Sequence, residues 1–100
     1  MPLYALLYNY TDQGLRDISE SPKRIRGLAD QFEKFGVKTH GIYVTIGPYD
    51  LVEIVEVPSE EVGLVGLLAK ASGGNVRTTT MRAFTLEEFE RAAAALPPPT

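Results

Sequence analysis

The chain contains no cysteine and no tryptophan, and it has a single histidine, His40. Without cysteine it cannot form disulfides, thiolate nucleophiles, or zinc and iron–sulfur sites held by thiolates. One histidine and scattered carboxylates also give no transition-metal ligand set within one chain, so we predict no metal and no cofactor. The absence of disulfides is compatible with a reducing compartment, and we expect a cytoplasmic protein.

The chain also has fewer basic than acidic residues, and its apolar runs are short. Ten lysines and arginines stand against 13 aspartates and glutamates, for a net charge of −3. A nucleic-acid-binding domain needs a basic face to neutralise phosphates, so we predict no nucleic-acid partner. The N-terminal residues MPLYALLYNY lack the basic start of a signal peptide, and no run reaches the roughly 18 apolar residues of a membrane span. We therefore predict no membrane association.

What is present is typical of one globular domain. The 100 residues are 44% apolar and 23% charged, which is an ordinary globular composition. A domain of this size buries only about two-thirds of its unfolded surface, so a partner subunit would add to its stability. We expect one domain over residues 1–96 and a proline-rich tail over residues 97–100.

Hydrophobic periodicity and capping residues predict four strands and three main helices. The strands are expected over residues 3–10, 37–46, 51–57 and 76–83. The helices are expected from Ser21 (N-cap) and Pro22 to before Gly36, from Ser59 to about Ala71, and from a Thr85–Glu88 capping box to Leu96. The order βαββαβ plus a C-terminal helix is that of a ferredoxin-like α+β fold, with helices on one face of a four-stranded antiparallel sheet. The expected strand order is fourth, first, third, second.

The second main helix is apolar almost all round. Its apolar positions are Val62, Leu64, Val65, Leu67, Leu68 and Ala69. A helix that is apolar on two faces is usually buried on two faces. We therefore expect a homodimer or a higher homo-oligomer, whose contacts include Val62, Val65 and Ala69 together with the uncovered face of the sheet.

Several short blocks resemble the GYD domain family. They are Thr11–Gly14, Tyr43–Gly47, Gly74–Thr78 and Arg82–Thr85, with the signature residues Gly47, Tyr49 and Asp50 in the turn before the third strand. The resemblance covers residues 3–96. It implies a dimeric α+β barrel, in which two sheets pack face to face, and it implies no established biochemical activity.

The strand alternation predicts which side chains the uncovered sheet face carries. If Ile46 pairs with Leu51, the helix-packed face receives Ile42, Val44, Ile46, Leu51, Val55 and Val57, with Met81 and Ala83 from the fourth strand. Glu53 is then an exception on the apolar side. The open face receives Tyr4, Tyr10, Thr39, Gly41, Val52, Ile54 and the candidate ligand-binding residues, which are Tyr8, Tyr43, Thr45, Glu56, Thr78, Thr80 and Arg82.

These residues admit a functional and a purely structural interpretation. In the functional one, tyrosines form the walls of a small-molecule pocket between sheet and partner, and Arg82 fixes a carboxylate or enolate oxygen. In the structural one, Tyr43, Thr78 and Thr80 pair across a sheet that is half exposed to water. Glu56 and Arg82 then form a salt bridge or an interface contact. Tyr49 and Asp50 have two interpretations as well: they are functional residues, or Asp50 only bonds its own backbone, as an aspartate in a tight turn normally does.

Three functions follow from this pattern. The first is a homo-oligomeric domain that binds or senses a small molecule between open sheet faces. The second is a cofactor-independent oxygenase or isomerase, in which His40 or Glu56 acts as the general base. The third is an assembly module without a ligand. Some domains with the same βαββαβ order bind RNA through aromatic side chains on the third strand. Here the third strand, residues 51–57, is acidic and carries no aromatic side chain, so we exclude RNA binding.

Overall fold

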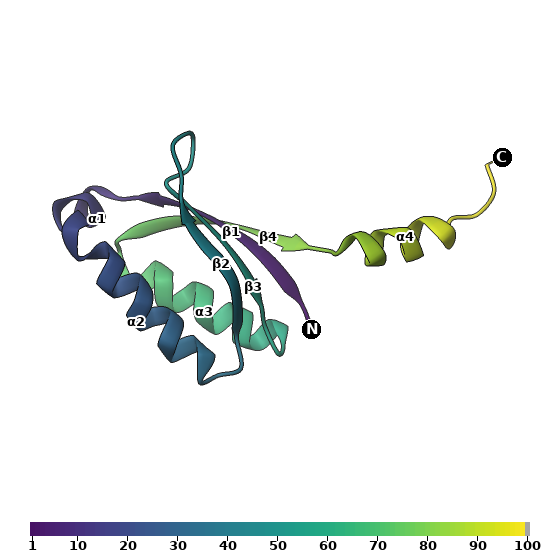
Figure 1. Cartoon of the computed structure of the whole chain (residues 1–100), viewed down its shortest axis with the longest axis horizontal. Coiled ribbons are helices and arrows are strands. Elements are labelled where there is room, and N and C mark those ends of the chain that lie inside the picture. Colours follow the sequence, from purple (N-terminus) through teal and green to yellow (C-terminus); the bar gives the residue numbers. More distant parts are fainter. Residues whose placement is uncertain (100) are drawn as a thin grey trace.

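The computed structural model describes residues 1–99 and contains the expected elements in the expected order (Figure 1). The strands are β1 (Leu3–Tyr10), β2 (Lys38–Val44), β3 (Leu51–Glu56) and β4 (Val76–Ala83). The α-helices are α1 (Asp12–Arg16), α2 (Ser21–Glu33), α3 (Glu60–Gly73) and α4 (Leu86–Ala94), with a 3₁₀ turn, η1 (Ile18–Glu20), before α2. Across residues 1–99, no helix is both long enough and apolar enough to cross a membrane.

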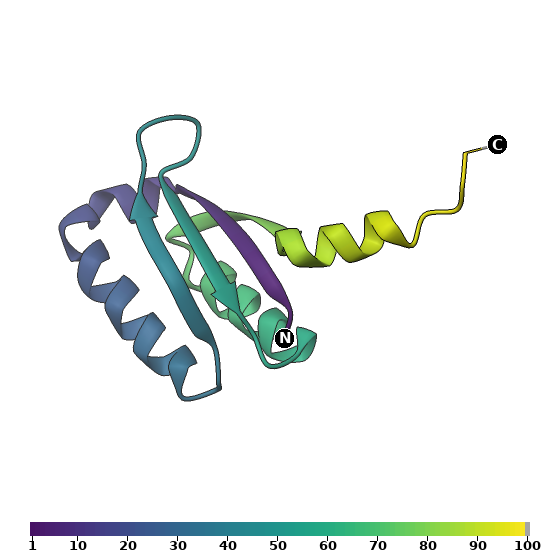
Figure 2. The same ribbon diagram turned by 45° about the vertical axis from the view of Figure 1, so that its right-hand side comes forward.

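The four strands form one antiparallel sheet in the order β2-β3-β1-β4, so the ferredoxin-like prediction is confirmed. Helices α2 and α3 lie on the same side of this sheet, and α4 projects away from it as a separate arm (Figure 2). The buried apolar core is small and comprises Leu6, Tyr8, Leu51, Val55 and Val57. The sheet therefore has one face under two helices and one open face.

Local capping explains where most helices begin and end. The Ser59 hydroxyl accepts from the Val62 amide at 3.2 Å, and Gly74 ends α3 with a left-handed φ of +73°. Thr85 and Glu88 form the predicted capping box of α4. The predicted N-cap of α2 is wrong: Ser21 is already helical, and its buried hydroxyl shares a hydrogen bond with the hydroxyl of Tyr10 instead.

The predicted pairing of the β2–β3 hairpin is wrong by two residues. Val44, rather than Ile46, pairs with Leu51, and a bulge at His40 interrupts the ladder between Thr39 and Gly41. The Thr45 amide donates to the Asp50 carbonyl at 2.9 Å and closes a longer loop than expected. Ile46 is consequently fully exposed in that loop, and Val44 is 78% exposed at the end of the sheet. Ile46 therefore lies outside the sheet, whereas Val44 keeps the predicted side of the sheet as the partner of Leu51 but is not covered by a helix.

The predicted faces of β1 and β4 are inverted. Residues paired directly across strands share a face, and Tyr8 pairs with buried Leu51 on one side and with Thr78 on the other. The helix side therefore receives Tyr4, Leu6, Tyr8 and Tyr10 from β1, and Thr78, Thr80 and Arg82 from β4. Met81 and Ala83 take the open side.

The cause of this inversion is that the rings of Tyr8 and Tyr10 are buried or partly buried while their hydroxyls find polar partners. Tyr8 bonds Glu53 and Tyr10 bonds Ser21, both on the helix side. The bulge at His40 has a similar consequence for β2, because it turns Thr39 to the helix side while Gly41 stays on the open side.

The C-terminal helix ends two residues before the expected Leu96. α4 ends at Ala94, and Pro97–Pro99 have no regular secondary structure. Thr100, the last residue of the expected tail, lies outside the described residues.

Candidate functional site

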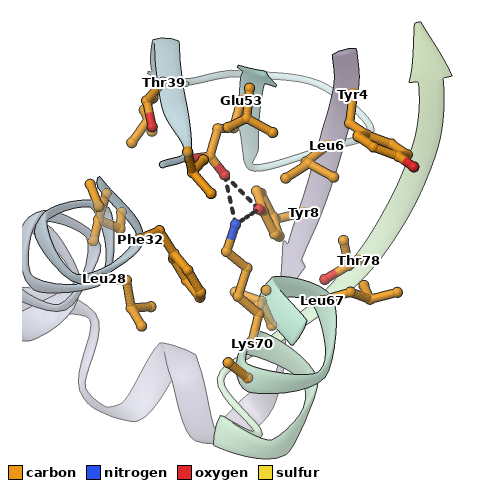
Figure 3. Close-up of a pocket in the computed structure, with 18 of the residues that line it drawn as sticks. Tyr4, Leu6, Tyr8, Leu28, Phe32, Thr39, Glu53, Leu67, Lys70 and Thr78 are labelled. Atoms are coloured by element: carbon orange, nitrogen blue, oxygen red, sulfur yellow. Dashed lines mark hydrogen bonds and ion pairs between the residues drawn. The ribbon is translucent and has the colours of Figure 1, made fainter. Parts of the chain in front are cut away.

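A cavity of about 600 Å³ lies between the sheet and the two helices that cover it (Figure 3). Its floor is formed by the helix-side residues of β1, β3 and β4, and its walls come from α2 and α3. Leu28 and Phe32 enter from α2, and Leu67 enters from α3. The lining is mainly apolar because each element contributes its core-facing stripe.

Three polar side chains meet inside this apolar lining, and we call them the Tyr8–Glu53–Lys70 cluster. The Tyr8 hydroxyl donates to Glu53 Oε1 at 2.7 Å. Lys70 Nζ donates to the same Glu53 oxygen at 2.9 Å and to the Tyr8 oxygen at 2.5 Å. The side chains of Lys70 and Glu53 are only 14% and 9% exposed, so this ion pair is largely withdrawn from water.

The surroundings stabilise a charged Lys70 and a neutral Tyr8. The ammonium lies 5.1 Å from the centre of the Tyr8 ring and 5.7 Å from that of Phe32, within cation–π range. Burial raises the pKa of Tyr8 far above its usual value, and the adjacent negative charge of Glu53 and the hydrogen bond to it raise this pKa further. Tyr8 therefore stays protonated and acts as a hydrogen-bond donor.

Thr78 adds a fourth polar group beside this cluster. It pairs with Tyr8 across β1 and β4, and it lines the cavity from the floor. Its Oγ1 atom is buried and has no hydrogen-bond partner among the residues that the structure describes. A buried hydroxyl without a partner is costly in an apolar setting.

The open sheet face carries a separate polar pair at its β2 edge. His40 Nε2 lies 2.9 Å from Glu56 Oε1, because the bulge lets the histidine side chain reach the open side of β3. The Tyr43 ring lies directly over Gly41, where any added Cβ would come within 3 Å of it. The two residues that the sequence offered as general-base candidates are thus in contact with each other.

The signature turn connects the hairpin to the end of β1. The Asp50 carboxylate accepts from the Tyr10 amide at 2.9 Å, and the Asp50 amide donates to the Tyr8 carbonyl at 2.8 Å. Thr45 Oγ1 donates to the Tyr49 carbonyl inside the loop. Gly47 has a φ of +152°, which L-residues rarely adopt. The Asp50 side chain therefore binds another strand rather than its own turn.

The predicted ligand-binding residues do not form one pocket. Tyr8, Thr78 and Thr80 line the helix-side cavity, whereas Tyr43 and Glu56 lie on the open face. Thr45 belongs to the hairpin loop. Arg82 lies over the rings of Tyr4 and Phe84 and donates to the Leu3 carbonyl, so it is not the predicted partner of Glu56. A ligand-binding role for each of these residues stays a prediction.

Sequence reasoning missed Lys70. The signal that could have identified it was Glu53, a carboxylate in the apolar alternation of β3, because a buried carboxylate requires a cation or several donors. α3 supplies that cation in its last turn. No group of three or more metal-ligating side chains occurs within residues 1–99.

The fold is that of a ferredoxin-like α+β domain and resembles the crystal structure of FFRP-DM1. That chain superimposes with a TM-score of 0.57 at 20% identity, over 84% of the present chain and all of the other. The GYD domain profile matches residues 4–93, and the protein belongs to the GYD domain family.

Two relatives come from Thermus thermophilus. One, described as a glutamine synthetase and cystathionine beta-lyase binding protein, is 33% identical over 90 residues, covering 89% of this chain and 95% of its own. The other is the crystal structure of TTHA0845, with a TM-score of 0.52 and 25% identity, over 85% of this chain and 95% of that chain. The family resemblance drawn from the Gly47–Tyr49–Asp50 signature is thus confirmed.

Proposed function

We propose that this protein is a homo-oligomeric protein-binding module that associates with metabolic enzymes, and that it is not itself a catalyst. The observation that carries the proposal is a pair of exposed apolar surfaces, namely the open sheet face and the stripe of α4. The relative described as binding glutamine synthetase and cystathionine beta-lyase supports the same interpretation.

The open sheet face is suited to a second copy of the chain. Its centre is apolar, with Leu7 from β1, Ile54 from β3 and Met81 from β4, and Tyr43 adds a 61% exposed ring at one edge. Lys38 and Arg77 provide polar margins. A face with an apolar centre and a polar rim is typical of an interface, and a two-fold axis would let the same patch serve both subunits.

Helix α4 is suited to a different protein. It leaves the domain directly after β4 and extends away from both the sheet and the other helices (Figures 1 and 2). Leu86 and Phe89 form its apolar stripe, Leu96 follows just beyond its end, and each of the three is at least 65% exposed. Amphipathic helices of this kind bind in hydrophobic grooves. Because Glu87 and Glu90 accompany the stripe, we expect a groove bordered by basic side chains on the partner enzyme.

The two surfaces are separable by mutation. Sedimentation of the intact protein at micromolar concentration is expected to give a dimer or a higher oligomer, and Ile54→Lys on the open face is expected to give a monomer.

Purified glutamine synthetase and cystathionine beta-lyase from the same organism serve as test partners in an interferometry assay. The variant Leu86→Ser/Phe89→Ser is expected to lose at least tenfold in affinity while it remains an oligomer.

The control is Glu87→Ser/Glu90→Ser, which changes the polar side of the same helix. It should reduce affinity less than the apolar variant does. A wild-type monomer would refute the oligomer, and equal binding by all α4 variants, or binding of neither enzyme, would refute the role of α4.

A second candidate function is binding or turnover of a small molecule at the open face, favoured by the His40–Glu56 contact of 2.9 Å. A histidine hydrogen-bonded to a carboxylate is the usual form of an oriented general base. If a metabolite screen finds a substrate, His40→Ala and Glu56→Gln should each lower turnover, and unchanged turnover in both would exclude this mechanism.

A further inference from the structure

The cavity under α2 and α3 combines features that packing alone does not require. Its volume of about 600 Å³ is within the roughly 300–1,000 Å³ usual for small-molecule pockets. The space between the two helices and the sheet is partly open to solvent, so a ligand can enter it. The cavity also contains polar groups among its apolar lining, namely the Tyr8–Glu53–Lys70 cluster, which lies between Phe32 and Leu67 in Figure 3, and Thr78.

We propose that this cavity is a binding site for an uncharged, mainly apolar small molecule that carries a carbonyl oxygen. The apolar portion of the ligand lies between Leu28, Phe32 and Leu67, and its oxygen is directed to Thr78 and Lys70. This site lies on the opposite side of the sheet from the proposed dimer surface, so it is independent of the protein-binding role.

The hydrogen-bond inventory indicates an acceptor on the ligand. An ammonium group has three N–H donors, and Lys70 uses two of them, on Tyr8 and Glu53. The Thr78 hydroxyl is buried and has no partner among the described residues, although it can donate a hydrogen bond. A carbonyl oxygen has two lone pairs, and it can accept from both groups.

Charge balance indicates that the ligand is neutral. The positive charge of Lys70 is already matched by Glu53 at 2.9 Å, in a site where both side chains are largely buried. A carboxylate ligand would add a second negative charge beside Glu53, and a buried charge without its own partner is strongly disfavoured. A neutral carbonyl adds an acceptor without disturbing the ion pair.

The test uses 2-decanone as the probe and decanoate as its charged counterpart of equal chain length. Calorimetric titration at pH 7 is expected to show saturable binding of 2-decanone, and binding of decanoate at least tenfold weaker. Intermolecular NOEs are expected between the probe methylenes and the side chains of Phe32 and Leu67. Absence of saturable 2-decanone binding, equal or tighter decanoate binding, or NOEs to Met81 and Tyr43 on the open face would each overturn the proposal.

Two matched pairs of variants locate the site. Leu67→Trp fills the cavity and is expected to abolish binding, whereas Leu68→Trp makes the same change on the exposed side of α3 and should preserve it. Thr78→Val should weaken 2-decanone about 3- to 10-fold, the usual effect of one lost hydrogen bond. Thr79→Val, one residue along and on the open face, should leave binding unchanged. Equal effects within either pair would overturn the assignment.

Discussion

Lys70 Nζ lies 2.9 Å from Glu53 Oε1 beneath the two helices, so a cation from the last turn of α3 matches the carboxylate that β3 directs into the core. This contact joins the third strand to the third helix at the centre of the domain. It also explains how an acidic residue is accommodated in an otherwise apolar alternation, since the Tyr8 hydroxyl supplies a second donor to the same oxygen.

Removal of Lys70 should therefore be strongly destabilising. Lys70→Met leaves the Glu53 carboxylate buried without a cation, and breaking a buried pair in this way costs about 3–5 kcal/mol. Urea denaturation followed by circular dichroism measures the change. The double variant Lys70→Met/Glu53→Gln removes both charges and should recover much of the lost stability. If the double variant is as unstable as the sum of the single ones, the two residues do not act as a pair.

The free energy of unfolding should decrease at alkaline pH because of Tyr8. Burial and Glu53 raise the pKa of Tyr8 in the folded state, whereas in the unfolded chain it titrates near 10. Its contribution to stability is complete below pH ~10 and is lost progressively above it, at up to about 1.4 kcal/mol per pH unit. Denaturation of wild type and Tyr8→Phe at pH 9, 10 and 11 tests this. The wild type should show the steeper decline, and parallel pH profiles would contradict the prediction.

Asp50 should stabilise the domain through β1. Its carboxylate accepts from the Tyr10 amide at 2.9 Å, beyond the last pair of the β1–β3 ladder. A hydrogen bond to a charged group contributes about 1.5–3 kcal/mol, so Asp50→Ala should lower the free energy of unfolding by an amount of that order. Asp50→Asn keeps an acceptor and should lose less. Faster hydrogen exchange of the Tyr10 amide in Asp50→Ala would locate the effect, and unchanged exchange would contradict it.

Gly14 and Gly27 should respond in opposite directions to alanine. A Cβ on Gly14 would lie 2.2 Å from the Asn75 carbonyl oxygen, whereas one on Gly27 has nothing within 4 Å. Gly14→Ala should therefore destabilise by about 1–3 kcal/mol through overpacking. Gly27→Ala, in the middle of α2, should stabilise by about 0.5–1 kcal/mol. Thermal melts of both variants beside wild type compare the signs, and two shifts of the same sign would contradict this account.

The element order could be predicted from the sequence because capping and periodicity are local signals. Three such signals depend only on residues that are close in sequence, and the structure agrees with all three. They are the N-cap Ser59, the Thr85–Glu88 capping box and the apolar alternation of residues 51–57. The strand order follows from topology rules that need only the succession of elements.

The face assignments failed where a local signal was ambiguous. In β1 both alternating sets contain bulky apolar or aromatic residues, so only the contacts of Tyr8 and Tyr10 with Glu53 and Ser21 decide which set is buried. In β2 the bulge at His40 shifts the alternation by one residue, and no pattern in the sequence indicates it. The candidate site was consequently divided between two faces.

The strand order has a consequence for the nascent chain. β1 is synthesised first yet lies between β3 and β4, and its ladder with β4 pairs Leu3 with Ala83. Such distant pairing makes folding slow, because the entropy of closing almost the whole chain must be lost before the contacts form. Until β4 leaves the ribosome, one edge of β1 is unpaired and able to capture other strands. The aggregation risk of this protein is therefore concentrated in the interval before β4 pairs with β1.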